Sequence, residues 1–151
     1  MATRAPDTVE LAARLRLAVT RLARRLRQEA GAGITPSMLS ALSSADRQGP
    51  FTMRDLCAAE QVQPPTMTRI VAALVTAGLV VREADAKDGR VAWVKVTADG
   101  RRLLERSRRR KEAFLARAMR DLEPRDVAAL EAAAGVLERF TGAPQEGGER
   151  R

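Results

Sequence analysis

The chain has 151 residues, the size of one ordinary domain, and 45% of them are hydrophobic, which is enough to fill one core. One cysteine and no histidine exclude an internal disulfide, a Cys/His zinc site and a catalytic dyad built on histidine. Aromatic residues make up only 3% of the chain, and alanine and leucine dominate the apolar set, so we expect a mainly helical protein.

The charge of the chain points to a polyanionic partner. Lysine and arginine number 27 against 19 acidic residues, which gives a formal net charge of +8. The basic excess lies in residues 1–30 and 101–121, and a basic helix face is as often a solvated surface as a binding one. No stretch reaches the roughly 18 apolar residues of a membrane span, and arginines interrupt the N-terminal apolar residues, so we expect a cytoplasmic protein that does not enter a membrane.

The first third of the chain is expected to form two helices. From residue 7 to 29, leucine or valine recurs every three or four positions, which predicts a long amphipathic helix. Thr35 followed by Pro36 provides an N-cap and a first-turn proline for a second helix through about Asp46.

Two shorter helices are expected next. Thr52, with Asp55 three residues later, resembles a capping box and predicts a helix to about Glu60. Cys57 lies in the apolar stripe of that helix, which indicates a buried structural thiol. After a brief turn, tandem prolines at 64 and 65 begin a helix that runs to about Thr76.

The helix from 64 to 76 has two different faces. One face is apolar and is expected to pack on a core; it carries Met67, Ile70, Val71 and Leu74. The other face is small and polar; it carries Pro65, Arg69, Ala72 and Thr76, with Thr66 and Thr68 beside them. A helix with such a face can enter the major groove of DNA.

A β-hairpin and two further helices complete the prediction. The runs 79–83 and 91–96 are β-prone, and the turn-rich, charged segment between them predicts a hairpin that Trp93 shields. Thr97 is expected to cap a long helix through about Asp121. Pro124 begins a last helix to 141, and residues 142–151 form a polar, flexible tail.

Three short helices followed by a hairpin predict a winged helix-turn-helix lobe over residues 35–97. In this arrangement the third helix reads base edges and the preceding helix crosses the phosphate backbone. The planar guanidinium of Arg69 can donate to O6 and N7 of one guanine. The expected DNA-binding residues are Gln63, Pro65, Thr66, Thr68, Arg69, Lys87, Asp88 and Arg90.

Two segments resemble the MarR family of bacterial transcriptional regulators. Residues 62–82 resemble that family's recognition helix and first wing strand. The segment Asp88-Gly89-Arg90, five residues, then Val96-Thr97 is similar to the family's wing signature of Asp-x-Arg, five residues, Leu-Thr. Gly89 stands where the family often has arginine, which removes one phosphate contact. The resemblance covers residues 7–141.

The resemblance implies a single MarR-like domain over residues 1–151, mainly α with a small β-hairpin wing. It implies a homodimer formed through helices at 7–30 and 98–141, and their leucine stripes independently favour a partner subunit. In such a dimer Arg90 would enter the minor groove, Asp88 would orient it by a bidentate pair, and Lys87 would reach phosphate.

Two functions are therefore considered. The first is a DNA-binding regulator, most simply a repressor that binds a pseudo-palindromic operator in double-stranded DNA, needs no cofactor, and is released by a small anionic or lipophilic effector. The second is a non-catalytic winged-helix module that binds RNA or an acidic protein. Only the first needs both Arg69 and Arg90 at positions that reach a groove. An enzyme is not expected, because no nucleophile and base are paired.

Overall fold

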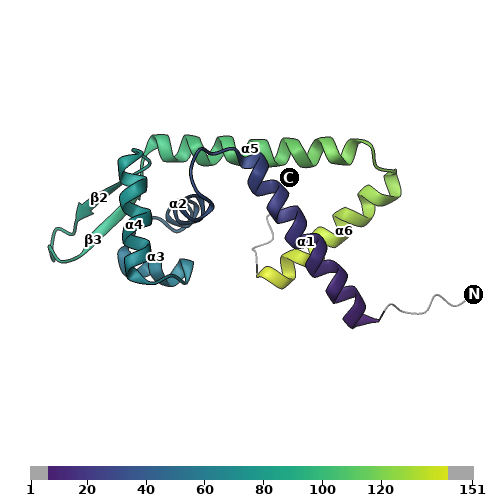
Figure 1. The fold of residues 1–151 in the computed structure, drawn as a ribbon, viewed down its shortest axis with the longest axis horizontal. Helices are drawn as coiled ribbons and strands as arrows, with labels where there is room; N and C mark the ends of the chain where they lie inside the picture. The colour runs from purple at the N-terminus through teal and green to yellow at the C-terminus, as the bar shows by residue number, and fades with distance from the viewer. Residues whose placement is uncertain (1–6, 143–151) are drawn as a thin grey trace, which may run out of the picture. The chain divides into compact units, whose positions relative to one another are not determined.

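The computed structural model describes residues 7–142, which form six α-helices and one small antiparallel sheet (Figure 1). The expected fold class, mainly α with a β-hairpin wing, is confirmed. The chain divides into two compact units, one up to Glu112 and one from Ala113, and each is considered by itself. Apart from Gly142, the predicted flexible tail lies outside the described residues.

The helices and strands follow the predicted order. They are α1 (Thr8–Ala30), α2 (Pro36–Gln48), β1 (Phe51–Thr52), α3 (Met53–Glu60), α4 (Pro64–Thr76), β2 (Val80–Ala84), β3 (Ala92–Val96), α5 (Ala98–Arg120) and α6 (Pro124–Thr141). Strand β1 was not predicted, because two residues are too few to show an alternating pattern. It pairs with β3, which lies between β1 and β2 in the sheet.

Local side-chain contacts explain where the lobe helices begin and end. The Thr35 hydroxyl accepts a hydrogen bond from the Met38 N–H at 3.2 Å, as expected of an N-cap. The capping box at Thr52 and Asp55 is complete, since each side chain accepts from the backbone N–H of the other residue. Helix α3 ends at Gln61, whose φ of 53° turns the chain sharply toward α4.

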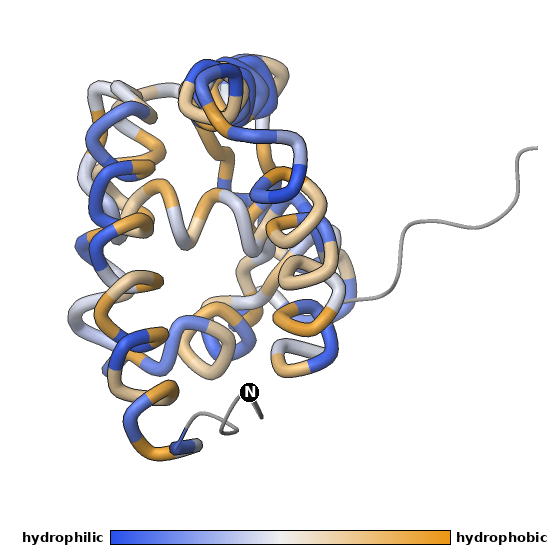
Figure 2. The backbone as a smooth tube through the Cα atoms, turned by 90° about the vertical axis from the view of Figure 1, so that its right-hand side faces the viewer, coloured by the Kyte–Doolittle hydropathy of each residue, from blue (hydrophilic) through white to orange (hydrophobic). Residues whose placement is uncertain are grey.

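The core of the lobe lies where α2, α3 and α4 pack against one another and against the sheet. Its largest fully buried side chains are Leu42, Leu56, Met67, Val71, Leu74, Val80 and Val94. The apolar face predicted for α4 is therefore the buried one. Cys57 packs against this core but is only half-buried. Hydrophobic and hydrophilic positions alternate along the helices in Figure 2, as expected of amphipathic segments.

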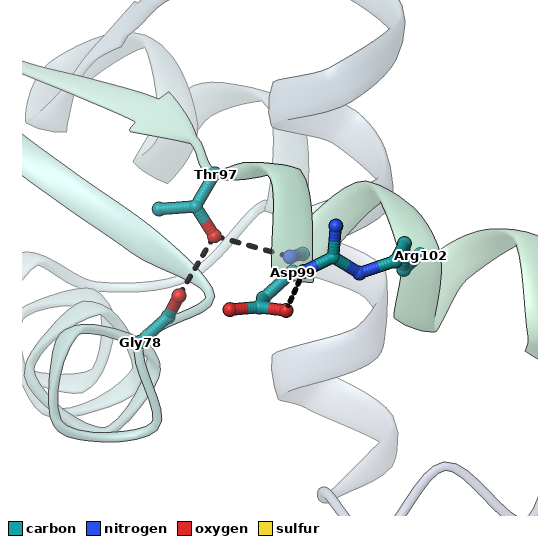
Figure 3. A network of polar contacts seen from close by, with 5 residues as sticks. Gly78, Thr97, Asp99 and Arg102 are labelled. Carbon is teal, nitrogen blue, oxygen red and sulfur yellow. Dashed lines mark hydrogen bonds and ion pairs between the residues drawn. The ribbon is translucent and has the colours of Figure 1, made fainter.

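The start of α5 is fixed to the base of the wing. The Thr97 hydroxyl donates to the Gly78 carbonyl at 2.7 Å and accepts from the Gly100 N–H at 3.1 Å (Figure 3). The Thr97 N–H also donates to the Leu79 carbonyl at 3.0 Å. The predicted cap at Thr97 is confirmed, and its hydroxyl additionally joins α5 to the turn after α4.

A second contact ties α5 to the end of α1. The Arg110 guanidinium donates to the carbonyl of Gly31 at 2.8 Å, where α1 ends in the left-handed region. This bond satisfies one of the carbonyls that the last turn of α1 leaves without a helical partner. The sequence did not predict it, because the two residues are far apart in the chain.

Two helices expose the apolar stripes that the sequence assigned to dimerisation. Helix α1 buries only Ala30, and α6 buries no residue within the described chain. The exposed large apolar residues of α1 are Val9, Leu11, Leu15, Leu17, Val19 and Leu22. Those of α6 are Val127, Leu130, Val136 and Phe140. Despite these stripes, none of the described helices has a stretch that is both long and apolar enough to cross a membrane.

Candidate nucleic-acid interface

The outward face of α4 carries the residues expected to read DNA. Gln63, Pro65, Thr68 and Arg69 are exposed, and Thr66 is half-buried. The tandem prolines occupy the first turn, where the absence of N–H groups leaves no helical bond unmade. The buried side of the helix fixes its rotation, so these five side chains lie at its N-terminal end and outer face.

The helix leaves the Gln63 side chain without a capping bond and engages the Thr68 hydroxyl in a hydrogen bond. The Gln63 carbonyl accepts from the N–H groups of Thr66 and Met67 at 3.0 and 3.1 Å, while its side chain makes no capping bond. The Gln63 amide is therefore available to an external group. The Thr68 hydroxyl donates to the Pro64 carbonyl at 2.9 Å, so in this rotamer it can accept a hydrogen bond but not donate one. Because a phosphate oxygen cannot donate a hydrogen bond, this geometry suits a base amino group better than a phosphate.

The wing turn is organised around Asp85, a residue that the sequence analysis missed. Its Oδ1 accepts from the N–H groups of Lys87 and Asp88 at 2.8 and 2.9 Å, and its Oδ2 accepts from the Trp93 indole N–H at 2.8 Å. The Trp93 bond, followed by the two backbone bonds, lowers the pKa of Asp85 below its ordinary value. The carboxylate therefore stabilises the folded wing above the ordinary pKa, and this contribution is lost as pH falls through the lowered pKa.

The predicted bidentate pair between Asp88 and the Arg90 guanidinium is not present. Instead, Asp88 Oδ1 accepts from the backbone N–H of Arg90 at 3.0 Å. This is an Asx-type bond two residues along the chain, which tight turns favour because the side chain is short. Asp88 therefore shapes the turn, and the exposed guanidinium of Arg90 is left to other contacts.

A shallow cleft of about 500 Å³ lies between the wing and the first turn of α3. Its wall includes the side chains of Arg54, Arg82 and Arg90 and one carboxylate, that of Asp55. Three guanidinium groups against one carboxylate make this cleft attractive to a phosphate. The sequence analysis missed Arg54 and Arg82. The sequence could have indicated Arg54, because a cation in the first turn of a helix is unfavourable to the helix dipole and therefore suggests a binding role.

Comparisons with known proteins agree with this geometry. The model of the MarR family matches residues 34–92, which span most of the lobe. An uncharacterized HTH-type transcriptional regulator of Mycobacterium leprae is 41% identical over 106 residues, covering 70% of this chain and 74% of that protein. The chain belongs to the MarR family. A solved transcriptional regulator protein of Pseudomonas aeruginosa is 36% identical, with a TM-score of 0.80 over 91% of this chain and 98% of that one.

A more distant structure is also similar in fold. A mutant of Staphylococcus aureus MepR bound to an oligodeoxyribonucleotide is 19% identical, with a TM-score of 0.68 over 87% of this chain and 97% of that one. Membership in the MarR family makes the chain a helix-turn-helix transcriptional regulator and not an enzyme. It favours the first of the two functions considered from the sequence over the module for RNA or an acidic protein.

Proposed function

We propose that this MarR-family regulator is a cytoplasmic repressor that binds a pseudo-palindromic operator as a homodimer. In this proposal a small anionic or lipophilic effector releases the protein from the operator. The observation that carries it is the outer face of α4, where Gln63, Pro65, Thr68 and Arg69 are exposed on a helix held by a buried opposite face. The similar fold of a MepR mutant in complex with DNA supports this use of the lobe.

In this proposal α4 enters the major groove. A helix fits that groove, and residues near its N-terminus reach base edges. Arg69 would donate two hydrogen bonds to one guanine, and the free Gln63 amide has the donor and acceptor pattern that matches adenine. Beside these bases, the Thr68 hydroxyl would accept a hydrogen bond from a base amino group. The ring of Pro65 and the methyl groups of Thr66 and Thr68 would contact a thymine methyl.

The wing would lie over the neighbouring minor groove. Arg90 would insert there, and Lys87 would contact phosphate, while Asp88 holds the turn through the backbone of Arg90. The cleft beside the wing adds Arg54 and Arg82 as further phosphate contacts. These contacts position the lobe on the duplex without reading sequence.

The exposed stripes of α1 and α6 support the homodimer. The row of Leu11, Leu15 and Leu22, each 37 to 47% exposed, has the character of a protein contact surface, and a partner subunit would cover it. A two-fold dimer presents two copies of α4, which match two inverted half-sites. The same pairing is the reason for expecting a pseudo-palindromic operator.

Arg69→Ala tests the major-groove contact. We expect it to lose discrimination at one base pair per half-site by about 1 to 3 kcal/mol, because the bidentate contact to guanine is lost. Nonspecific DNA binding should change less. The measurement is a titration of wild type and variant against operators that differ at single base pairs, with Arg125→Ala on α6 as a control that removes the same charge elsewhere. Equal weakening on every sequence would make Arg69 a phosphate contact instead.

Arg90→Ala tests the minor-groove contact. We expect the variant to lose most affinity on operators with A·T-rich flanks, because narrow A·T-rich grooves concentrate negative potential, while the preferred central bases stay the same. Arg90→Lys should restore part of the loss, since an ammonium keeps the charge but is more strongly hydrated. Titrations on operators that differ only in their flanks measure this. A loss of equal size on A·T-rich and G·C-rich flanks contradicts insertion into the groove.

A further inference from the structure

The Asp85 carboxylate is the centre of the wing turn. It accepts three hydrogen bonds, from the N–H groups of Lys87 and Asp88 and from the indole of Trp93. Two of these bonds come from the tip of the turn and one from strand β3. One side chain thus connects the tip to the sheet.

Hydrogen bonds between backbone groups also close this turn. The Asp85 N–H donates to the Val91 carbonyl at 2.8 Å, and the Val91 N–H donates to the Asp88 carbonyl at 2.9 Å. The Arg90 N–H donates to the Asp88 carboxylate as well. In total, five of the seven residues from Asp85 to Val91 donate their backbone N–H within this turn. An exposed charged connection of this length would otherwise sample many conformations.

Trp93 gives the network a rigid base. It is half-buried on β3, where its backbone pairs with Glu83 of β2 on one side and Thr52 of β1 on the other. An indole has one donor and no acceptor, so its bond to Asp85 fixes both the ring and the carboxylate. The position of the tip is therefore set by the central strand of the sheet.

We propose that Asp85 and Trp93 are positioning residues for DNA binding, which order the wing before DNA is met so that Arg90 is presented to the minor groove. This inference rests on the proposed function, in which the target of Arg90 is the minor groove of the operator. A loop that is already ordered does not lose its conformational freedom on binding, so the affinity gained through Arg90 is larger. Neither Asp85 nor Trp93 needs to touch DNA.

Three variants separate the parts of the network. Asp85→Ala removes all three bonds to the carboxylate. Asp85→Asn keeps a carbonyl oxygen for the N–H groups of Lys87 and Asp88 but sets an amide donor against the indole N–H, so only the Trp93 bond is lost. Trp93→Phe removes that same bond from the other side. We expect Asp85→Ala to weaken binding to an A·T-flanked operator by about three- to tenfold, and the other two variants to weaken it less and by similar amounts.

The decisive measurement repeats these titrations in an Arg90→Ala background. If Asp85 acts through Arg90, Asp85→Ala should then cost less than about twofold, because the residue that it positions is gone. The same loss with and without Arg90 would overturn the proposal, as would unchanged affinity for Asp85→Ala in the wild-type background. If Asp85→Ala does not fold, Asp85→Asn and Trp93→Phe decide the question by the same comparison.

A readout without DNA separates this proposal from the proposed function. The chain has one tryptophan and no tyrosine, so its emission reports on the Trp93 site alone. In Asp85→Ala we expect a shifted emission and faster hydrogen exchange at the N–H groups of Lys87 and Asp88, with α-helical circular dichroism unchanged. Unchanged exchange would overturn the ordering role even if wild type binds its operator. If wild type binds no DNA while exchange rises as expected, the proposed function fails and the ordering of the wing by Asp85 stands.

Discussion

Leu22→Asp is expected to convert the protein from a dimer to a monomer and to lower operator affinity by about two orders of magnitude or more, because two linked half-site contacts become one. Leu22 lies in the exposed apolar stripe of α1 with 45% of its surface accessible in the single chain. A partner subunit that covers this stripe would bury the new carboxylate without a counter-charge. Leu137→Asp on α6 should act in the same way.

Sedimentation at micromolar concentration measures this directly. Wild type should sediment at about twice 16.4 kDa and the variants near 16.4 kDa. Arg24→Asp is the matched control, since it places an acidic side chain roughly 200° around the same helix from Leu22. A Leu22→Asp protein that stays dimeric, or a wild type that remains a folded monomer of unchanged stability on dilution, contradicts the proposed dimer.

Gly100→Ala is expected to lower the free energy of unfolding by about 2 to 3 kcal/mol. A Cβ atom at this position would lie 2.3 Å from the Leu79 carbonyl oxygen and 2.8 Å from Val96 Cγ1. The oxygen belongs to the backbone, which also accepts the Thr97 N–H, so it cannot rotate aside. The start of α5 would have to move off the base of the wing, although alanine is otherwise the better helix former.

Urea denaturation of Gly100→Ala and Gly89→Ala tests this contact. Gly89 is a matched control because a Cβ there meets no atom within 4 Å and its backbone is not in the left-handed region. Its substitution should change stability by less than about 0.5 kcal/mol. Similar stability for both variants would mean that α5 can shift away from Leu79 without cost.

The elements that could be predicted from the sequence are those that depend on neighbouring residues. The inward face of α4 follows from the helical spacing of Met67, Val71 and Leu74, and all three are buried. The caps at Thr52 and Thr97 follow from residues within one turn of each. The resemblance at the wing identified the family for the same reason, since its motif is a short run of adjacent positions.

The features that were missed depend on distance in space. The bond between Asp85 and Trp93 crosses the hairpin, and that between Arg110 and Gly31 joins α5 to α1, so no local pattern indicates either. The expected pairing of Asp88 with the Arg90 guanidinium was wrong because the backbone N–H of Arg90 lies closer to the carboxylate in the turn. Charge complementarity in the sequence does not distinguish a guanidinium from a backbone donor two residues away.

Selection of bound duplexes from a random DNA library by the wild-type protein tests the central claim most directly. The account predicts enrichment of two inverted half-sites about one helical turn apart, with a guanine at one fixed position in each and A·T-rich flanks. Repeating the selection with Arg69→Ala should retain the spacing and lose the guanine. Recovery of no common sequence, or of a single half-site without a symmetric partner, would contradict the proposal that this dimer reads an operator through α4.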